Sequence, residues 1–435
     1  MRRLLIIIVV LASRMLAAQE EQVVCLYLRD SIGPIVNATV RLTGSFKSGT
    51  TGSQGQVRLR LPRAKQYAFT CFHPAYKTRQ CLFQGGDADT LRYQVKLLRK
   101  VLSLDTVNVV AYKAPETLHR SVQYSVIDFE FTDDGFLLVT TGGSQNNLIL
   151  RLTDGNGKEL HTRDVPVKEG TKVELRSDYQ GYINLVTPTL VYRLADWNQR
   201  IMIEEVPLSD YRKYLEPIKD SVNGQLLYSD QVNYYPAFNY NAVRLEDTAR
   251  QTLRQIIDVD LMRFYHLEYY YLSSRMQLEA RRTADAYGID EYMAAALLSG
   301  FVNSKYYDVL YAPLFIVGDT ICIFDHYRDK LYRYTTTLEP MDSVSISYHH
   351  PVKWTDWKKK MFKDELYEQV YALYSRDAHQ YIKRINVKSG KEEGQFKLTH
   401  YSAERIKIRD GYVYYVYRPA GSTQEKYFYR ELIRI

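Results

Sequence analysis

The chain has 435 residues, of which 46% are hydrophobic and 25% are charged, and a formal net charge of +8 at pH 7. These proportions are those of an ordinary globular protein that is long enough for two or three domains. A mild positive excess spread over this length does not indicate nucleic-acid binding, so that class of function is set aside. The composition is unusual in its 39 tyrosines, because tyrosine suits half-buried strand faces and ligand-contacting surfaces alike.

The first residues have the pattern of a secretion signal. Arg2 and Arg3 form a basic start, residues 4–12 are apolar, and Ala17 and Ala18 provide a small-residue cleavage site. We therefore predict that residues 1–18 are a signal peptide and that the protein is exported to the periplasm or associates with the outer membrane. No later stretch reaches about 18 apolar residues, so no transmembrane segment is expected in the mature chain.

Residues 23–100 are expected to form the first domain. Several short strands broken by Gly, Pro, Asn and Asp indicate a small β-sandwich. Cys71 and Cys81 flank a predicted hairpin with the same strand parity, which makes them candidates for a disulfide in an exported chain. Whether they are bridged is left open, and Cys25 and Cys322 are expected to be buried thiols. Because the sequence has no CxxC pair, it predicts neither a zinc site nor a thioredoxin-like site.

Two stretches of this first domain carry a family resemblance. Residues 33–38, Gly-Pro-Ile-Val-Asn-Ala, precede an expected strand, and residues 51–56 stand in place of a T-D-x-x-G-x turn. On these residues the segment resembles the carboxypeptidase regulatory-like domain, a transthyretin-like sandwich. It departs from that pattern where Ala75 replaces the Gly of a G-Y pair and where Gly52 or Ser53 replaces the turn Asp. The resemblance implies a fold that is appended to other modules, and it implies no catalysis.

Residues 101–122 are expected to link this domain to the rest of the chain. The last sequence repeat supplies only about three strands. A strand at residues 107–112 could provide the fourth, which would close a ring of repeats with N-terminal chain and leave no free sheet edge.

Residues 126–207 carry one pattern written twice, with a period of 41 to 46 residues. Each copy has about four runs that alternate apolar and polar residues between turns, which predicts a four-stranded antiparallel sheet. A single sheet of this kind would expose both of its faces to solvent, so the copies are expected to stack on one another. Their period is that of a propeller blade, which predicts that they stack around a ring. We predict a β-propeller of about six blades over residues 123–435, with five or seven left open. The matched positions are Gly135 with Gly181, Asp154 with Asp196, and Pro166 with Pro207.

The repeat pattern breaks once, over residues 245–302, which have helical character. Asp260 and Asp290 are the expected N-caps of this α-helical insertion, and Gly288 and Gly300 its expected stops. The insertion is expected either to cover the edge of a blade or to dock a partner. The predicted fold class is therefore mainly β, a small sandwich plus a propeller with a helical insertion.

The densest group of polar residues, 325–329, follows an expected strand at residues 320–324. In a propeller, loops that join inner strands line one end of the central channel, where ligands bind. Asp325 and His326 are therefore the predicted ligand-binding residues, with solvated turns as the alternative explanation. Asp325 could accept hydrogen bonds or bind a cation, and His326 could change charge near neutral pH. Comparable loops contain His349, His350 and Arg418.

The sequence contains no recognisable catalytic set. None of the nine histidines is followed by Glu three residues on, so the ligand pair of zinc carboxypeptidases is missing. A Gly-x-Ser-x-Gly nucleophile motif and a phosphate-binding loop are also absent. We therefore predict no catalytic residue, no metal and no cofactor, and leave open whether the protein is an enzyme, with a non-enzymatic role favoured.

The sequence favours an exported binding or scaffold protein of the bacterial cell envelope that recognises a protein or glycan partner, in an outer-membrane complex. The alternative is a hydrolase or lyase that acts on polysaccharide or peptide in the propeller channel. The enzyme hypothesis predicts carboxylate and histidine side chains that converge in the channel with shifted pKa values. The binding hypothesis predicts an exposed aromatic patch on one rim or on the helical insertion.

Overall fold

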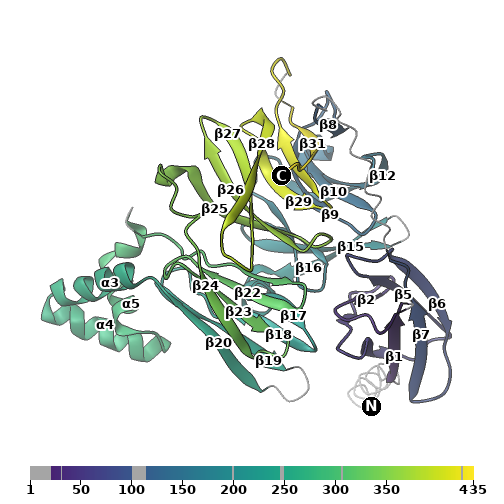
Figure 1. Cartoon of the computed structure of the whole chain (residues 1–435), viewed down its shortest axis with the longest axis horizontal. Helices are drawn as coiled ribbons and strands as arrows, with labels where there is room; N and C mark the ends of the chain where they lie inside the picture. Colours follow the sequence, from purple (N-terminus) through teal and green to yellow (C-terminus); the bar gives the residue numbers. More distant parts are fainter. Residues whose placement is uncertain are drawn as a thin grey trace, which may run out of the picture.

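The computed structural model describes residues 21–30, 32–99, 114–197, 200–244, 249–304, 307–422 and 425–435. The protein is mainly β: a two-sheet sandwich stands beside a propeller of six four-stranded sheets, and a helical segment projects from the propeller (Figure 1). The predicted fold class is confirmed.

The sandwich is built from two small sheets that share one apolar core. One sheet contains, in order, β4 (Gln56–Pro62), β1 (Glu21–Arg29) and β7 (Thr90–Lys96). The other contains β3 (Ser48–Thr50), β2 (Thr39–Leu42), β5 (Gln66–Phe72) and β6 (Arg79–Gln84). Alternate residues of β4 and β5 face the space between the sheets, where Leu59, Leu61 and Phe69 are buried. This alternation is the period-two pattern that the sequence shows.

Thr51, fully buried, fixes the turn between β3 and β4. Its Oγ1 accepts a hydrogen bond from the Ala38 N–H (2.9 Å) and donates one to the Ile35 carbonyl (2.7 Å). The hydroxyl thus pairs two backbone groups that the sandwich buries. This turn carries part of the family resemblance, but the strand topology does not test that relationship, so it stays a proposal.

Cys71 on β5 and Cys81 on β6 are diagonal neighbours, because Cys71 lies opposite Arg79 and Cys81 opposite Phe69. Both are free thiols in this structure, and a hydrogen bond from Cys71 together with nearby Arg79 lowers the pKa of Cys81 to about 7. The disulfide stays a prediction. We expect Cys81 to be the first of the two to be alkylated near neutral pH, measured by peptide mass spectrometry. A bridged pair would instead resist alkylation until a reductant is added.

Each propeller blade is an antiparallel meander of four strands. The first blade contains β9 (Val126–Phe131), β10 (Gly135–Thr140), β11 (Asn147–Asp154) and β12 (Glu159–Lys168). The second contains β13 (Glu174–Ser177), β14 (Ile183–Val186), β15 (Leu190–Trp197) and β16 (Arg200–Pro207). The third contains β17 (Ile218–Val222), β18 (Gln225–Ser229), β19 (Ala237–Arg244) and β20 (Arg250–Ile257). The fourth contains β21 (Leu314–Val317), β22 (Thr320–Asp325), β23 (Lys330–Thr335) and β24 (Pro340–Ser345). The fifth contains β25 (Trp357–Asp364), β26 (Gln369–Arg376), β27 (His379–Ile385) and β28 (Glu392–Tyr401). The sixth contains β29 (Glu404–Arg409), β30 (Tyr412–Tyr417), β31 (Tyr427–Leu432) and β8 (Glu116–His119).

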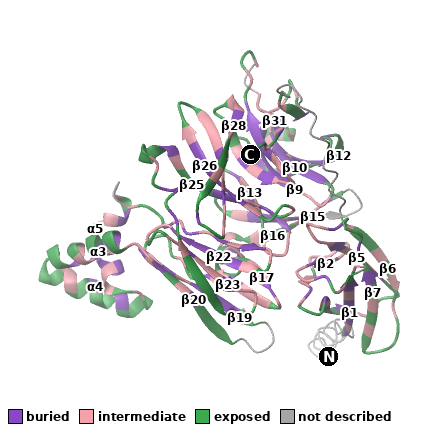
Figure 2. Cartoon of the chain, viewed as in Figure 1, coloured by how far each residue is buried: buried purple, intermediate pink, exposed green. Residues whose placement is uncertain are grey.

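The first strand of each blade lies nearest the propeller axis, since β9 contacts β13, β17 contacts β21 and β25 contacts β29. Apolar cores fill the spaces between neighbouring blades. Leu137, Leu150 and Leu185, for example, belong to a core shared by the first two blades. Figure 2 shows buried residues along the propeller strands and many exposed residues on the helical projection. Stacking of sheet on sheet therefore supplies the burial that a lone blade lacks.

The ring is closed by chain that precedes it in the sequence. Strand β8 pairs antiparallel with β31, and its Thr117 lies opposite Tyr429. Leu118 of β8 is buried among residues of the first and last blades, including Phe129 and Phe428. The segment proposed for this role, residues 107–112, lies outside the described residues.

The helical projection follows the third blade and contains α3 (Val259–Tyr271), α4 (Ser274–Tyr287) and α5 (Glu291–Ser299). Its predicted start at residue 245 is wrong for residues 250–257, which form β20. The spacing of buried Leu253 and Ile256 suits a helix, but pairing with β19 decides the structure. Asp258, rather than Asp260, caps α3, by accepting a hydrogen bond from Leu261 N (2.9 Å). The predicted N-cap at Asp290 is confirmed. The predicted stops Gly288 and Gly300 are also confirmed, as C-caps in the left-handed conformation.

Short helical turns occupy several connections between strands. They are η1 (Ser144–Asn146), α2 (Leu208–Asp210), η2 (Tyr211–Leu215), η3 (Phe301–Asn303) and η4 (Trp354–Asp356). Across the part of the chain that the structure describes, no helix is long and apolar enough to cross a membrane.

Candidate functional site

A cleft of about 1130 Å³ lies between the sandwich and one end of the propeller. Its propeller side is built from the inner strands and the turns that follow them, so all six blades contribute. In blade order, the contributing residues include Asp133, Asp178, Asp220, Gly318, Glu365 and Asp410. The sandwich thus covers the mouth of the central channel.

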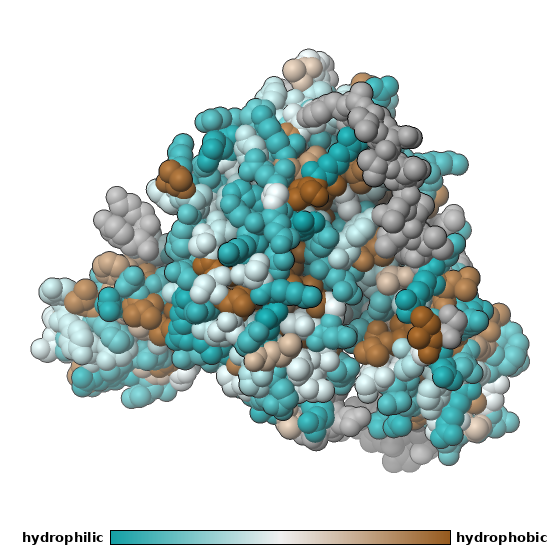
Figure 3. Space-filling view, in the orientation of Figure 1, coloured by the Kyte–Doolittle hydropathy of each residue, from teal (hydrophilic) through white to brown (hydrophobic). Residues whose placement is uncertain are grey.

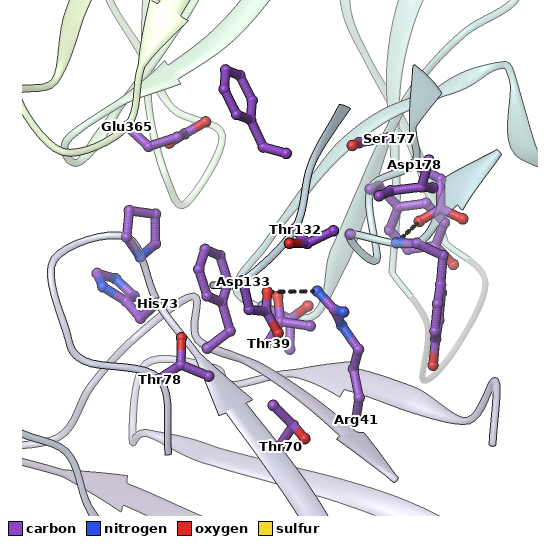
Figure 4. A pocket seen from close by; sticks show the side chains of 18 of the residues that line it. Thr39, Arg41, Thr70, His73, Thr78, Thr132, Asp133, Ser177, Asp178 and Glu365 are labelled. Atoms are coloured by element: carbon purple, nitrogen blue, oxygen red, sulfur yellow. Dashed lines mark hydrogen bonds and ion pairs between the residues drawn. The ribbon is translucent and has the colours of Figure 1, made fainter. Parts of the chain in front are cut away.

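Strands β2 and β5 and the loop before β6 form the sandwich side of the cleft. Thr39 and Arg41 point toward the propeller turns in Figure 4, and Thr70, His73 and Thr78 lie on the same side of the cleft. Arg41 crosses the cleft and pairs with Asp133 of the first blade at 3.4 Å. Both side chains are 20% exposed, so this ion pair is partly screened by solvent and joins the two domains at one edge of the cleft.

A second contact between the domains is made at the turn of the second blade. Tyr182 is almost fully buried and donates a hydrogen bond to the Ser45 carbonyl (3.3 Å). The guanidinium groups of Arg41 and Arg193 lie 5.4 Å and 4.3 Å from the centre of its ring. Gly181 before it has φ +76°, and a Cβ there would lie 2.7 Å from Arg41 Nη2. Asp178 holds the turn, because it accepts from the Tyr182 N–H (3.0 Å) and pairs with Arg193 (3.0 Å). These residues position the sandwich over the channel.

The lining of the cleft is acidic, although the whole chain is basic. Eight carboxylate side chains line it, against four lysine and arginine side chains. The carboxylates are Glu130, Asp133, Asp134, Asp178, Asp220, Glu365, Glu368 and Asp410, and the cations are Arg41, Lys219, Lys363 and Arg409. Glu130 pairs with Lys407 and Asp178 with Arg193, so six carboxylates remain against the four lining cations. Such an excess of negative charge in a concave site attracts cationic ligands.

Asp220 is the carboxyl group in the cleft with the clearest shift in pKa. Burial against the inner strands raises its pKa to about 6, and Lys363 only partly offsets this. Its Oδ1 accepts a hydrogen bond from the Ser221 N–H at 2.8 Å. Lys363 pairs with Glu365 at 2.5 Å, so a protonatable carboxyl group, an ammonium and a second carboxylate lie close together.

Ion pairs also join the inner strands of the last and first blades deeper in the ring. Lys407 on β29 pairs with Glu130 on β9 at 2.7 Å and donates a hydrogen bond to the Phe129 carbonyl at 2.6 Å. Arg405 lies 3.6 Å from Asp128, which is buried and has its pKa raised by that burial. These ion pairs stabilise the contact between the last and the first blade.

The structure places the predicted ligand residues away from this cleft. Gly318, before β22, lines the cleft, whereas Asp325 ends that strand, about 20 Å further along. Asp325 is fully buried, and burial raises its pKa. His326 lies within 2.8 Å of both the Tyr311 carbonyl and the Tyr348 hydroxyl. Burial lowers its pKa to about 3, so it stays neutral near pH 7, contrary to the expected charge change.

Three other polar residues from the predicted loops do come together. Asp329 Oδ1 lies 2.9 Å from His349 Nε2 and 2.8 Å from His350 Nε2. His349 also packs against the ring of His326, with 4.8 Å between ring centroids. Arg418 lies exposed in the loop after β30. Ligand binding by Asp325 and His326 stays a prediction.

Sequence reasoning missed the cleft because two domains form it. A signal was nevertheless present in the repeats. Gly135 and Gly181 were matched as turn residues, and Asn223-Gly224 and Asp410-Gly411 follow the first strands of two further blades. Turns at one position of every repeat must meet at one end of a ring, so these turns predict a shared surface.

The helical projection carries exposed aromatic side chains. The exposed fraction is 66% for Tyr270, 85% for Tyr271, 78% for Tyr287 and 48% for Phe264. Hydrophobic residues gather over the helices among hydrophilic ones in Figure 3. Exposed aromatic residues on this insertion are what the binding hypothesis predicted.

Comparisons with known proteins show distant likenesses only. No protein-family model matches the chain, and a search of curated proteins finds no significant relative. Among solved structures, a luciferin-regenerating enzyme has a TM-score of 0.35 at 10% identity over 73% of this chain and 95% of its own. A streptogramin B lyase has a TM-score of 0.33 at 11% identity, over 74% of this chain and 87% of its own. A prolyl endopeptidase has a TM-score of 0.33 at 9% identity, over 92% of this chain and 51% of its own. Likenesses this distant carry no functional argument.

Proposed function

We propose that this is an exported binding protein of the bacterial cell envelope that holds a cationic peptide segment between its sandwich and its propeller. The observation that carries the proposal is the cleft, which seven structural units build together and in which six carboxylates remain against four cations once the pairs of Glu130 with Lys407 and of Asp178 with Arg193 are set aside. Export rests on the N-terminal signal pattern. We further infer that the sandwich is a regulatory-like module, supported by its two-sheet fold and its Thr51 turn.

The size and chemistry of the cleft fit an extended peptide. Its volume of about 1130 Å³ is slightly above that of ordinary ligand pockets, which hold roughly 300–1,000 Å³. Its walls mix hydroxyl groups of Thr39, Thr70 and Thr78 with carboxylates, so both backbone groups and cationic side chains of a peptide can be paired. An acidic glycan would meet repulsion from the same carboxylates.

The test is peptide binding by fluorescence anisotropy. Labelled Lys- and Arg-containing peptides are compared with neutral and acidic peptides of equal length. In the double variant Glu365→Gln/Glu368→Gln we expect the affinity for the cationic peptides to fall about tenfold, because two charges facing the ligand are removed. Both side chains are exposed, so folding should be preserved.

The matched control is Glu268→Gln/Glu279→Gln on the helical projection, which makes the same change in net charge outside the cleft. Equal loss of affinity in the two double variants, or preference for acidic peptides, would contradict the proposal.

One observation favours a second candidate function, a hydrolase or lyase. A carboxyl group whose pKa is raised to about 6, as in Asp220, can donate or accept a proton near neutral pH. Glu365 lies beyond Lys363 as a second carboxylate. Turnover of a glycan or peptide library that is abolished by Asp220→Asn, with binding retained, would support this enzyme over the binding protein.

A further inference from the structure

A compact group of metal-ligand side chains lies outside the cleft. Asp329 belongs to the turn between β22 and β23, and His349 and His350 belong to the connection between β24 and β25. The turn follows the end of β22 that is remote from the cleft, so this group and the cleft are separate sites.

The donor atoms of the group converge without rearrangement of the backbone. Asp329 Oδ1 lies 2.9 Å from His349 Nε2 and 2.8 Å from His350 Nε2, and one donor atom from each residue lies within 4.8 Å of the others. A tetrahedral zinc ion with bonds of about 2.0–2.1 Å needs neighbouring donor atoms about 3.3 Å apart. Small movements of the two exposed side chains, Asp329 and His350, would open that space.

The fold holds the three residues in place independently of their mutual contact. The Asp329 carbonyl accepts a hydrogen bond from the Ile346 N–H (3.0 Å), and Asp329 has a φ of +53°. The His350 N–H donates to the Ser347 carbonyl (3.0 Å), which closes the turn that presents both histidines. The His349 ring is buried against His326. A site of this kind is largely formed before its ligand arrives.

We propose that Asp329, His349 and His350 bind a divalent transition-metal ion of the zinc class, with the fourth position open to solvent. Two imidazoles and one carboxylate, with a free position, are the ligand set that zinc has in several hydrolytic enzymes. Imidazole donors favour Zn²⁺ and its neighbours over Mg²⁺ and Ca²⁺, which prefer sets of oxygen ligands. The sequence predicted no metal because Asp329 is 20 residues from the histidine pair, beyond any local motif.

The groups around His349 limit the affinity of the site for zinc. His349 Nε2 also lies 3.1 Å from the His326 carbonyl, and its buried Nδ1 has no hydrogen-bond partner among the described residues. Metal on Nε2 leaves the proton on Nδ1, without the acceptor that orients most zinc-bound histidines, which costs about 10–100-fold in affinity. We therefore expect a dissociation constant for Zn²⁺ that is roughly micromolar.

The experiment is calorimetric titration of the full chain, without a histidine tag, with Zn²⁺, followed by Co²⁺ absorption spectroscopy. One saturable equivalent is expected, and bound Co²⁺ should give the strong visible bands of a tetrahedral site. Asp329→Asn keeps the left-handed turn, since Asn tolerates that conformation, but removes the anionic ligand. Asp329→Asn and His350→Ala should each weaken binding at least tenfold.

The matched control is Asp377→Asn, an exposed aspartate with φ +50° in the equivalent turn of the fifth blade. Retention of full affinity in this control, with loss in the other two variants, would support the site. The proposal is overturned by the absence of a saturable equivalent, by equal binding in all variants, or by octahedral Co²⁺ bands. Peptide binding in the cleft is expected to be unaffected by Asp329→Asn, so this test stands apart from the proposed function.

Discussion

Replacing Phe428 with alanine is expected to lower the free energy of unfolding by about 3–5 kcal/mol, the usual cost of removing a buried phenylalanine. Phe428 is fully buried on β31, and its ring centroid lies 4.4 Å from that of Phe129 and 5.0 Å from that of Phe136. The cavity would open where the last blade meets the first. Loss of this contact weakens the one junction of the ring that depends on chain segments far apart in sequence.

Urea unfolding followed by tyrosine fluorescence and far-UV circular dichroism measures this effect. Phe264→Ala, which removes a 48% exposed ring on α3, is the control and should change stability by less than about 0.5 kcal/mol. Leu118→Ala tests the same junction from β8, with an expected loss of about 2–4 kcal/mol. If both junction variants unfold like the control, ring closure contributes little, and the stacking of consecutive blades must hold the propeller.

Much of the propeller could be predicted from the sequence because each blade repeats a local pattern. The matched glycines Gly135 and Gly181 mark the same turn in two blades, and alternation of apolar residues fixes which strand face is buried. The prediction was wrong at β20, where Leu253 and Ile256 have the spacing of a helix face. The spacing of apolar residues cannot distinguish a helix from a strand in such a short segment. Here the segment becomes a strand because it pairs with the free edge of β19.

The candidate sites were less accessible from the sequence, for a physical reason. Asp325 and His326 were chosen because polar residues cluster there. Asp325 is instead fully buried, with its Oδ1 accepting from the Tyr327 N–H, and hydrogen bonds occupy both ring nitrogens of His326. The cleft depends on contacts such as Arg41 with Asp133, which join residues 92 positions apart. Local patterns show where turns lie along the chain, but which turns face a second domain follows from packing between domains.

Asp220→Asn is expected to stabilise the protein near neutral pH by about 3 kcal/mol and to have little effect near pH 4. The sign follows from burial, which raises the pKa of Asp220 to about 6, above its ordinary value of 3.8. Between these values the unfolded chain releases its proton first, so the wild-type protein loses stability as the pH rises, and above the folded pKa the full cost is present. Asn avoids that cost and its Oδ1 can still accept the Ser221 N–H.

The measurement is the free energy of unfolding of both proteins from pH 4 to pH 8, with Asp285→Asn on α4 as an exposed control. A difference that grows with pH for Asp220→Asn alone would confirm the shifted pKa, and a constant difference would contradict it. Groups that serve a functional site often lower the stability of the folded protein. If Asp220→Asn raises stability but weakens peptide binding or abolishes turnover, Asp220 takes part in the function of the cleft. If it raises stability and leaves binding and turnover unchanged, the function depends on Glu365 and its neighbours instead.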